Sequence, residues 1–139
     1  INESWYLVDL PGYGYARVSK AKKKIFQTFI TNYFKSRFNL VSAFLLIDIR
    51  HEPQPIDLKF MEWLCKNLIP FSIVFTKADK LKPMVLERNI SNYKNDMLST
   101  NWEEIPRMFI TSSHHNTGGK EVLTCIEQLN KTYLKNINT

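Results

Sequence analysis

Short, nearly uninterrupted apolar runs alternate along the chain with longer segments in which apolar residues recur every three or four positions. The runs predict strands covered on both faces, and we expect them at residues 5–9, 40–49, 70–75 and 107–111. The periodic segments predict helices at residues 19–37, 56–67, 84–98 and 119–135, the first capped by Ser19 and the second started by Pro55. Such alternation is typical of an α/β fold with a mostly parallel sheet and helices on both faces.

The composition is that of a globular protein. A length of 139 residues and a hydrophobic content of 44% are enough for one domain with its own core. No apolar run approaches the roughly 18 residues of a membrane-spanning helix, so we expect a cytoplasmic protein. The net charge of +6 favours a polyanionic partner, with plain solubility of a basic surface as the alternative. Cys65 and Cys125 fall in apolar helical patterns without the spacing of a metal site, and we expect both in the core.

Polar residues follow three of the predicted strands at the point where each strand ends. Asp9 to Gly12 (DLPG) follow the first strand, Thr76 to Asp79 (TKAD) the third, and Thr111 to Ser113 (TSS) the fourth. In an open parallel sheet the strand-to-helix loops meet at one edge, where ligands bind. The sequence therefore predicts a ligand site built from these three loops.

The order of these loops, with the longer segments LVDLPGYGYARVSK, IDIRHEP and FTKADKL, resembles the EngB family of bacterial GTP-binding proteins, within the translation-factor-like (TrmE-Era-EngA-EngB-septin) GTPase superfamily. The resemblance runs from Tyr6 to about Leu134. It implies a Ras-like, P-loop NTPase-type fold that binds GTP or GDP with Mg²⁺. It also implies a role in assembly of the large ribosomal subunit and in cell division and septation. The implied partners are precursor rRNA and ribosomal proteins, with neither a membrane nor DNA.

The resemblance assigns roles to the residues of the three loops. The loop that senses the γ-phosphate and Mg²⁺ comprises Asp9, Leu10, Pro11 and Gly12. The guanine-reading loop comprises Thr76, Lys77, Ala78 and Asp79, and the loop that closes on the base comprises Thr111, Ser112 and Ser113. The chemistry of the first loop suits this role, because a carboxylate such as Asp9 can hold a water of hydrated Mg²⁺. Gly12 has no Cβ to keep a backbone N–H away from a phosphate oxygen. A plain Pro-Gly turn is the alternative.

In the guanine-reading loop, the resemblance gives the base-selecting role to Asp79. Its carboxylate would accept hydrogen bonds from N1–H and the exocyclic amine of guanine, a pair of donors that adenine lacks. The alkyl stem of Lys77 would lie along the base plane, and Thr76, where Asn is commoner, would tie the loop to its neighbours. The backbone N–H near Ser113 would meet the guanine carbonyl oxygen while Ser112 braces the loop. A solvated charged loop and an ordinary serine turn are the alternatives.

Two expected parts of such a site do not occur in these 139 residues: the phosphate-binding pattern GxxxxGK[ST] and a switch threonine before Asp9. In the family both lie upstream, and the strand that carries the phosphate loop would pair between residues 5–9 and 40–49. Without that strand, two buried edges lack partners. We therefore expect the chain to be the C-terminal part of a single GTP-binding domain whose phosphate-loop segment lies upstream. Folding of these residues alone as a monomer and domain exchange are the alternatives.

The sequence offers no candidate catalytic residue. Tyr13 stands where Ras-like proteins carry the glutamine that orients the attacking water. We therefore expect a slow GTPase that needs the upstream loop and a partner, and that acts mainly as a switch. A nucleotide-independent RNA- or ribosome-binding module is the alternative function. An adenine-specific NTPase is a weaker third option, because Asp79 disfavours it.

A basic cluster surrounds the start of the first predicted helix: Arg17, Lys20, Lys22, Lys23 and Lys24. Cations at a helix N-terminus oppose the helix dipole. We therefore expect a compensating anion and infer rRNA phosphates, with a solvated basic face as the alternative. His114 and His115 lie in a polar loop without nearby cysteine or carboxylate ligands, and we expect them to be solvated.

Overall fold

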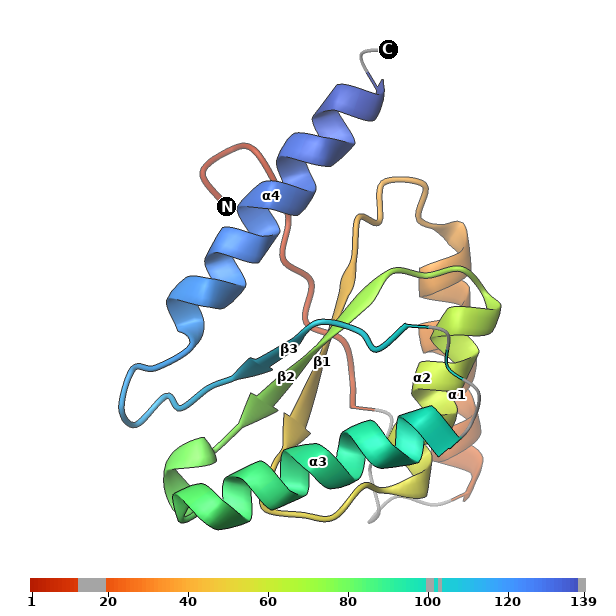
Figure 1. The fold of residues 1–139 in the computed structure, drawn as a ribbon. Coiled ribbons are helices and arrows are strands. Elements are labelled where there is room, and N and C mark those ends of the chain that lie inside the picture. Colours follow the sequence, from red (N-terminus) through yellow and green to blue (C-terminus); the bar gives the residue numbers. More distant parts are fainter. Residues whose placement is uncertain (13–19, 100–101, 103, 138–139) are drawn as a thin grey trace. The chain divides into compact units, whose positions relative to one another are not determined.

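The computed structural model describes the chain except for residues 13–19, 100–101, 103 and 138–139. The chain divides into two compact units, residues 1–40 and 41–139, each considered by itself. The 41–139 unit contains a parallel sheet of three strands in the order β1 (Ala43–Asp48), β2 (Phe71–Thr76) and β3 (Met108–Ile110) (Figure 1). Its helices are α2 (Pro55–Lys66), the short 3₁₀ helix η1 (Ala78–Lys80), α3 (Pro83–Ser99) and α4 (Gly119–Ile137).

The predicted α/β fold is confirmed, and its connections explain where the loops lie. Helix α2 joins β1 to β2 and α3 joins β2 to β3, as parallel strands require. Figure 1 shows α2 and α3 on one side of the sheet and α4 on the other. Because the strands are parallel, their carboxyl ends share one edge of the sheet. The segments that follow β1, β2 and β3 therefore start side by side.

The core of this unit lies between the sheet and helices α2 and α3. Alternate strand residues point to the same side of a sheet, and the buried ones are Leu45, Ile47, Ile73 and Phe75. The helices contribute Met61, Leu64, Tyr93 and Met97, all fully buried. The rings of Phe75 and Tyr93 lie 5.2 Å apart between their centroids. This packing fixes α3 against the strand that leads into the TKAD segment.

The outer edge of β1 has no partner strand among the described residues. The strand pairs along its length with β2, and Leu46 is 70% exposed. An unpaired edge at this strand is what the resemblance predicts for the position next to the phosphate-loop strand.

The 1–40 unit contains helix α1 (Lys20–Ser36), as predicted, but its expected strand does not form. Residues 5–12 have no regular secondary structure, and Tyr6 and Leu7 are 88% and 69% exposed. The prediction of a strand at 5–9 is therefore wrong for this structure. A strand needs a neighbour for its backbone N–H and C=O groups, and the resemblance gives this segment the phosphate-loop strand as neighbour. The expected helix cap, Ser19, lies outside the described residues.

The predictions for the two cysteines and for the start of α2 can also be compared with the structure. Cys125 is buried, as expected, but Cys65 is exposed, so its assignment to the core is wrong. It follows Leu64 directly and is therefore rotated about 100° away from that buried residue around α2. Pro55 is the first residue of α2, as predicted.

None of the described helices is both long enough and apolar enough to cross a membrane.

Candidate functional site

The segment after β2 is tied to the end of β1 through Thr76. The Thr76 hydroxyl donates a hydrogen bond to the carbonyl oxygen of Ile47, 3.2 Å away, and the N–H of Ile49 donates to the Thr76 carbonyl oxygen at 3.3 Å. The next residue, Lys77, has a φ of 61°, in the left-handed region that turns the chain sharply into η1. The TKAD segment thus leaves the sheet in a defined direction.

The same segment is tied to the end of β3. The N–H of Ala78 donates to the carbonyl oxygen of Thr111 at 3.2 Å. Both the N–H and the hydroxyl of Thr111 in turn donate to the carbonyl oxygen of Phe75, at 2.7 Å and 3.0 Å. Thr111, the first residue of the TSS segment, is therefore bonded both to Ala78 within the TKAD segment and to Phe75 just before it.

Asp79 and Ser112 meet between these two segments. The Ser112 hydroxyl donates to Oδ1 of Asp79 at 2.7 Å, and the Asp79 side chain is 4% exposed. This hydrogen bond, with a smaller contribution from Lys80, lowers the pKa of Asp79 to about 2. The carboxylate is therefore ionised at neutral pH and can act only as a hydrogen-bond acceptor.

The second oxygen of Asp79 is buried without a hydrogen-bond donor in the part of the chain that the structure describes. It lies 3.0 Å from Nζ of Lys80 as an ion pair. Buried carboxylate oxygens normally accept hydrogen bonds, because leaving them unpaired costs free energy. Oδ2 of Asp79 therefore has, among the described residues, only the ion pair with the half-exposed Lys80 side chain, and it can still accept a hydrogen bond at the loop edge of the sheet.

The TSS segment begins a closed loop. Ser112 and Thr117 exchange two backbone hydrogen bonds of 3.1 Å and 3.0 Å, and the N–H of His115 donates to the Ser112 hydroxyl oxygen at 3.1 Å. Gly118 then turns the chain with a φ of 77°, and a Cβ there would lie 2.1 Å from the carbonyl oxygen of Ile110. Only glycine fits this approach, which fixes the loop against β3.

Ser113 lies exposed at the start of this loop, and its N–H donates to no described group. Such an N–H is open to an acceptor on a ligand. His114 and His115 are exposed, as expected, with ring centroids 4.8 Å apart.

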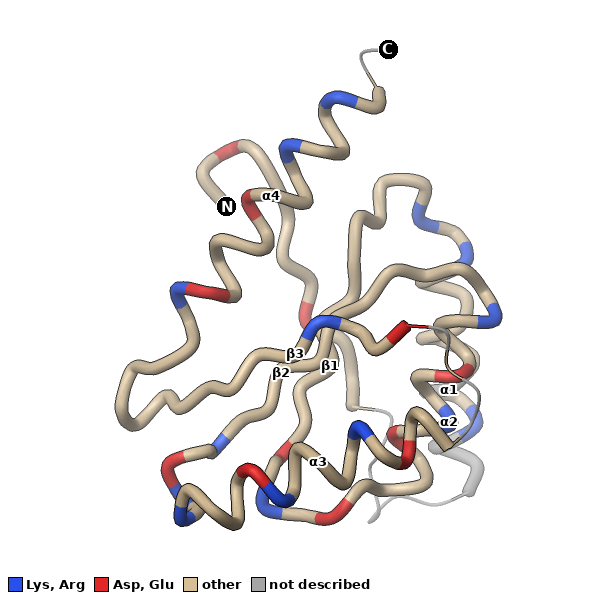
Figure 2. The backbone as a smooth tube through the Cα atoms, viewed as in Figure 1, with Lys and Arg blue, Asp and Glu red and all other residues tan. Residues whose placement is uncertain are grey.

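Sequence reasoning missed two residues at this edge, Asp48 and Arg50. Asp48 ends β1, and its carboxylate accepts from Nε and Nη2 of Arg50 at 2.9 Å and 2.7 Å and from Nζ of Lys77 at 2.8 Å. The hydrogen bonds from Arg50, followed by those from Lys77, hold the pKa of Asp48 well below its usual range. A carboxylate at the end of an apolar strand, the pattern that drew attention to Asp9, was the available signal. Figure 2 shows acidic and basic positions together where β1 and β2 end.

The remaining predicted residues belong to the 1–40 unit and are described by themselves. Asp9, Pro11 and Gly12 are exposed and Leu10 is half-buried. Among the described residues, no group of three or more histidine, cysteine or acidic side chains is placed to hold a metal ion. Asp9 is thus a single carboxylate, which suits a water-mediated contact but not a complete metal site.

Of the basic cluster, Arg17 lies outside the described residues, while Lys20, Lys22, Lys23 and Lys24 fall in the first turns of α1. The first turn carries no acidic residue, and the side chain of Lys24 is exposed.

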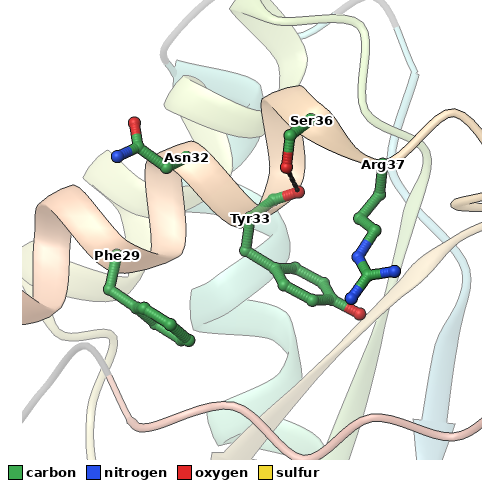
Figure 3. A pocket seen from close by; sticks show the side chains of 5 residues that line it. All are labelled: Phe29, Asn32, Tyr33, Ser36 and Arg37. Carbon is green, nitrogen blue, oxygen red and sulfur yellow. Dashed lines mark hydrogen bonds between the residues drawn. The ribbon is translucent and has the colours of Figure 1, made fainter.

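A hollow at the other end of α1 was not anticipated (Figure 3). The Arg37 guanidinium lies 5.0 Å from the centroid of the Tyr33 ring, and the Ser36 hydroxyl donates to the Tyr33 carbonyl oxygen at 3.4 Å. These contacts close the last turn of the helix, where a cation also complements the dipole.

Curated proteins of high similarity share one name, "Probable GTP-binding protein EngB". The protein from Christiangramia forsetii is 58% identical over 132 residues, covering 95% of this chain and 66% of the relative. The protein from Bacteroides thetaiotaomicron is 55% identical, covering 98% and 67%, and that from Flavobacterium johnsoniae is 52% identical, covering 98% and 65%. The chain thus spans about two thirds of the length of these relatives. No family model matches the chain.

One solved structure supports the fold. The crystal structure of GDP-bound aIF5B from Aeropyrum pernix matches with a TM-score of 0.54 and 21% sequence identity, over 68% of this chain and 21% of that chain. This likeness shows a P-loop NTPase-type fold. The relatives confirm the resemblance drawn from the loop motifs, and the chain belongs to the EngB family of GTP-binding proteins.

Proposed function

We propose that the chain forms the base-binding part of a GTP-dependent switch in assembly of the large ribosomal subunit. The observation that carries the proposal is the Asp79 carboxylate: it is buried and ionised, and its Oδ2 makes no hydrogen bond among the described residues and has only an ion pair with the half-exposed Lys80. Guanine presents two adjacent N–H donors, at N1 and at the exocyclic amine, that suit such a carboxylate. Adenine does not, so the same group supplies the base preference.

The neighbouring groups suit the rest of the base. Ser113 is exposed and its N–H donates to no described group, so it is an available donor for the guanine carbonyl oxygen. Lys77 directly precedes η1, and its alkyl stem is long enough to cover one face of a purine. Thr76 ties the TKAD segment to β1, and Ser112 ties the TSS segment to Asp79, through the hydrogen bonds described above.

For the phosphate end, we propose that the segment Asp9 to Gly12 senses the γ-phosphate of GTP. Asp9 would hold a water of a hydrated Mg²⁺, and the backbone at Gly12 would approach a phosphate oxygen. When bound, Mg²⁺ neutralises charge on the phosphates during transfer. The chain's own part is to order this segment around GTP and release it with GDP, with slow hydrolysis that a partner accelerates.

The partner proposed for the GTP-bound form is a precursor of the large ribosomal subunit. The supporting observations are the net charge of +6 and the lysines at the start of α1, whose first turn has no acidic residue. A contribution to cell division and septation would follow from ribosome supply. A cytoplasmic location is part of the same proposal.

The test is Asp79→Asn in the full-length protein. An amide would set a donor against the exocyclic amine of guanine, and GDP affinity should fall on the order of a hundredfold. Xanthine has a carbonyl oxygen in place of that amine, so affinity for xanthosine diphosphate should rise. The measurement is a pair of titrations, with GDP and with xanthosine diphosphate, on wild type and variant.

Asp96→Asn is the matched control, because it makes the same change at an exposed residue of α3 and should leave both affinities unchanged. A variant that still prefers GDP as strongly as wild type removes Asp79 from the base site. A wild-type protein that binds ribosomal particles but no guanine nucleotide would favour the nucleotide-independent RNA-binding module.

A further inference from the structure

We propose that Asp48 is a positioning residue of the guanine site, which acts by holding the ammonium group of Lys77. This inference rests on the proposed function of the TKAD segment as the base-reading loop. It adds to that site a residue from the end of a different strand.

Strand pairing places Asp48 at the required point. In the parallel register of β1 and β2, Asp48 lies opposite Thr76, the residue that precedes Lys77. Nζ of Lys77 reaches Oδ2 of Asp48 at 2.8 Å, across 29 positions of sequence. The contact therefore depends on the sheet and not on local sequence.

The Asp48 carboxylate is itself held in one orientation by Arg50. Nε of Arg50 donates to Oδ1 at 2.9 Å, Nη2 donates to Oδ2 at 2.7 Å, and the backbone N–H of Arg50 donates to Oδ1 at 3.2 Å. A guanidinium that binds both oxygens fixes the plane of a carboxylate, whereas an ammonium makes a single-point contact. Arg50 thus sets the plane of the carboxylate, and Lys77 binds one of its oxygens.

The result is that Lys77 is fixed at both ends. Its backbone lies between Thr76, bonded to β1, and Ala78, bonded to Thr111. Its ammonium is held by Asp48, although the Lys77 side chain is 51% exposed. An unanchored lysine stem samples many rotamers, and ordering it on ligand binding costs conformational entropy. Asp48 removes part of that cost before the base arrives, which favours slow nucleotide release.

Two cations share this single carboxylate, so the cluster keeps a net positive charge. The Asp48 side chain is 21% exposed and the Arg50 side chain 42%. Because both partners favour the ionised form, Asp48 stays charged throughout the neutral pH range. The anchoring of Lys77 is therefore constant and not a pH-sensitive switch.

The test is a double-mutant cycle on the full-length protein, read as the release rate of a fluorescent GDP analogue. Asp48→Asn should raise the release rate about fivefold, in the range of partly exposed ion pairs. In a Lys77→Met background, which keeps the apolar stem but has no ammonium, Asp48→Asn should have no further effect. The single variant Asp48→Glu keeps the negative charge, and its GDP release rate should lie within about twofold of wild type.

Glu52→Gln is the matched control. This carboxylate lies in the same loop after β1 but accepts from Asn92 of α3, at 2.8 Å, and should not change GDP release. An equal effect of Asp48→Asn with and without Lys77→Met would show that Asp48 acts through the fold, and this would overturn the inference. So would an unchanged release rate in the single variant. A wild-type protein that binds no GDP would refute the proposed function first, and the inference with it.

Discussion

The hydroxyl of Ser112 donates a hydrogen bond to the carboxylate of Asp79 across 33 positions of sequence. The same hydroxyl oxygen accepts from the N–H of His115. One serine side chain therefore joins the loop after β3 to the carboxylate proposed to read the base. Its hydrogen bond holds Oδ1 of Asp79 and leaves Oδ2 with the ion pair to Lys80.

Ser112→Ala should weaken GDP binding about tenfold, because a hydrogen bond to a charged group is lost and the Asp79 carboxylate is no longer held. Loss of this hydrogen bond should also raise the pKa of Asp79 from about 2 towards the ordinary range. Calorimetric titration measures the first effect, and carbon NMR of the carboxyl group across a pH series measures the second.

The pKa of Asp79 lies below that of an unfolded aspartate, roughly 3.9. Its ionised form therefore stabilises the fold above that pH, and the contribution is lost as the pH falls towards about 2.

Ser113→Ala is the control for this prediction. It makes the same change at the next residue, keeps the backbone N–H, and removes a hydroxyl that is exposed. GDP affinity should then be unchanged. Equal losses in the two variants would show that the loop tolerates no alanine and would remove the specific role of Ser112.

Gly118→Ala should destabilise the protein by at least about 2 kcal/mol, because a positive φ and a backbone clash act together. The added Cβ would meet the carbonyl oxygen of Ile110 at 2.1 Å, so the loop from Ser112 to Thr117 must move away from β3. Urea unfolding measures the stability. Gly119→Ala is an unusually close control, since a Cβ at that position has no atom within 4 Å. A Gly118→Ala variant as stable as Gly119→Ala would contradict the described turn.

Replacing Lys22, Lys23 and Lys24 together with glutamine should weaken binding to large-subunit precursor particles. If these lysines contact phosphates, the slope of log affinity against log salt should also become shallower by about two. Guanine-nucleotide affinity should stay constant. The control changes the net charge equally at exposed lysines elsewhere: Lys59, Lys66 and Lys94 to glutamine. Equal weakening by both triple variants would indicate a general charge effect without a defined RNA-binding cluster.

Much of the 41–139 unit was predictable from hydrophobic pattern alone. The apolar runs that became β1 and β2 are short and continuous, which distinguishes them from the longer periodic helical segments, and the TKAD and TSS residues follow strands in chain order. Parallel pairing then brings them to one edge whatever the details of the loops. The contact between Asp79 and Ser112 is a consequence of that topology.

The errors have physical causes that a single sequence does not display. Whether residues 5–9 form a strand depends on a neighbouring strand and not on their own propensity. The ion pair between Asp48 and Lys77 depends on strand register, which is set when β1 and β2 pair. Cys65 has the composition of a core position, but its place around the axis of α2 turns it outward.

Thr76, Asp79 and Ser112 belong to the 41–139 unit, where Thr76 is bonded to β1 and Asp79 to Ser112, whereas Asp9 and Gly12 belong to residues 1–40. If the former group selects the base and the latter responds to the γ-phosphate, the two properties are encoded in separate stretches of the gene. Substitutions in one stretch can then be selected without disturbing the other. The base preference of such a protein can change during evolution while its response to the γ-phosphate stays the same.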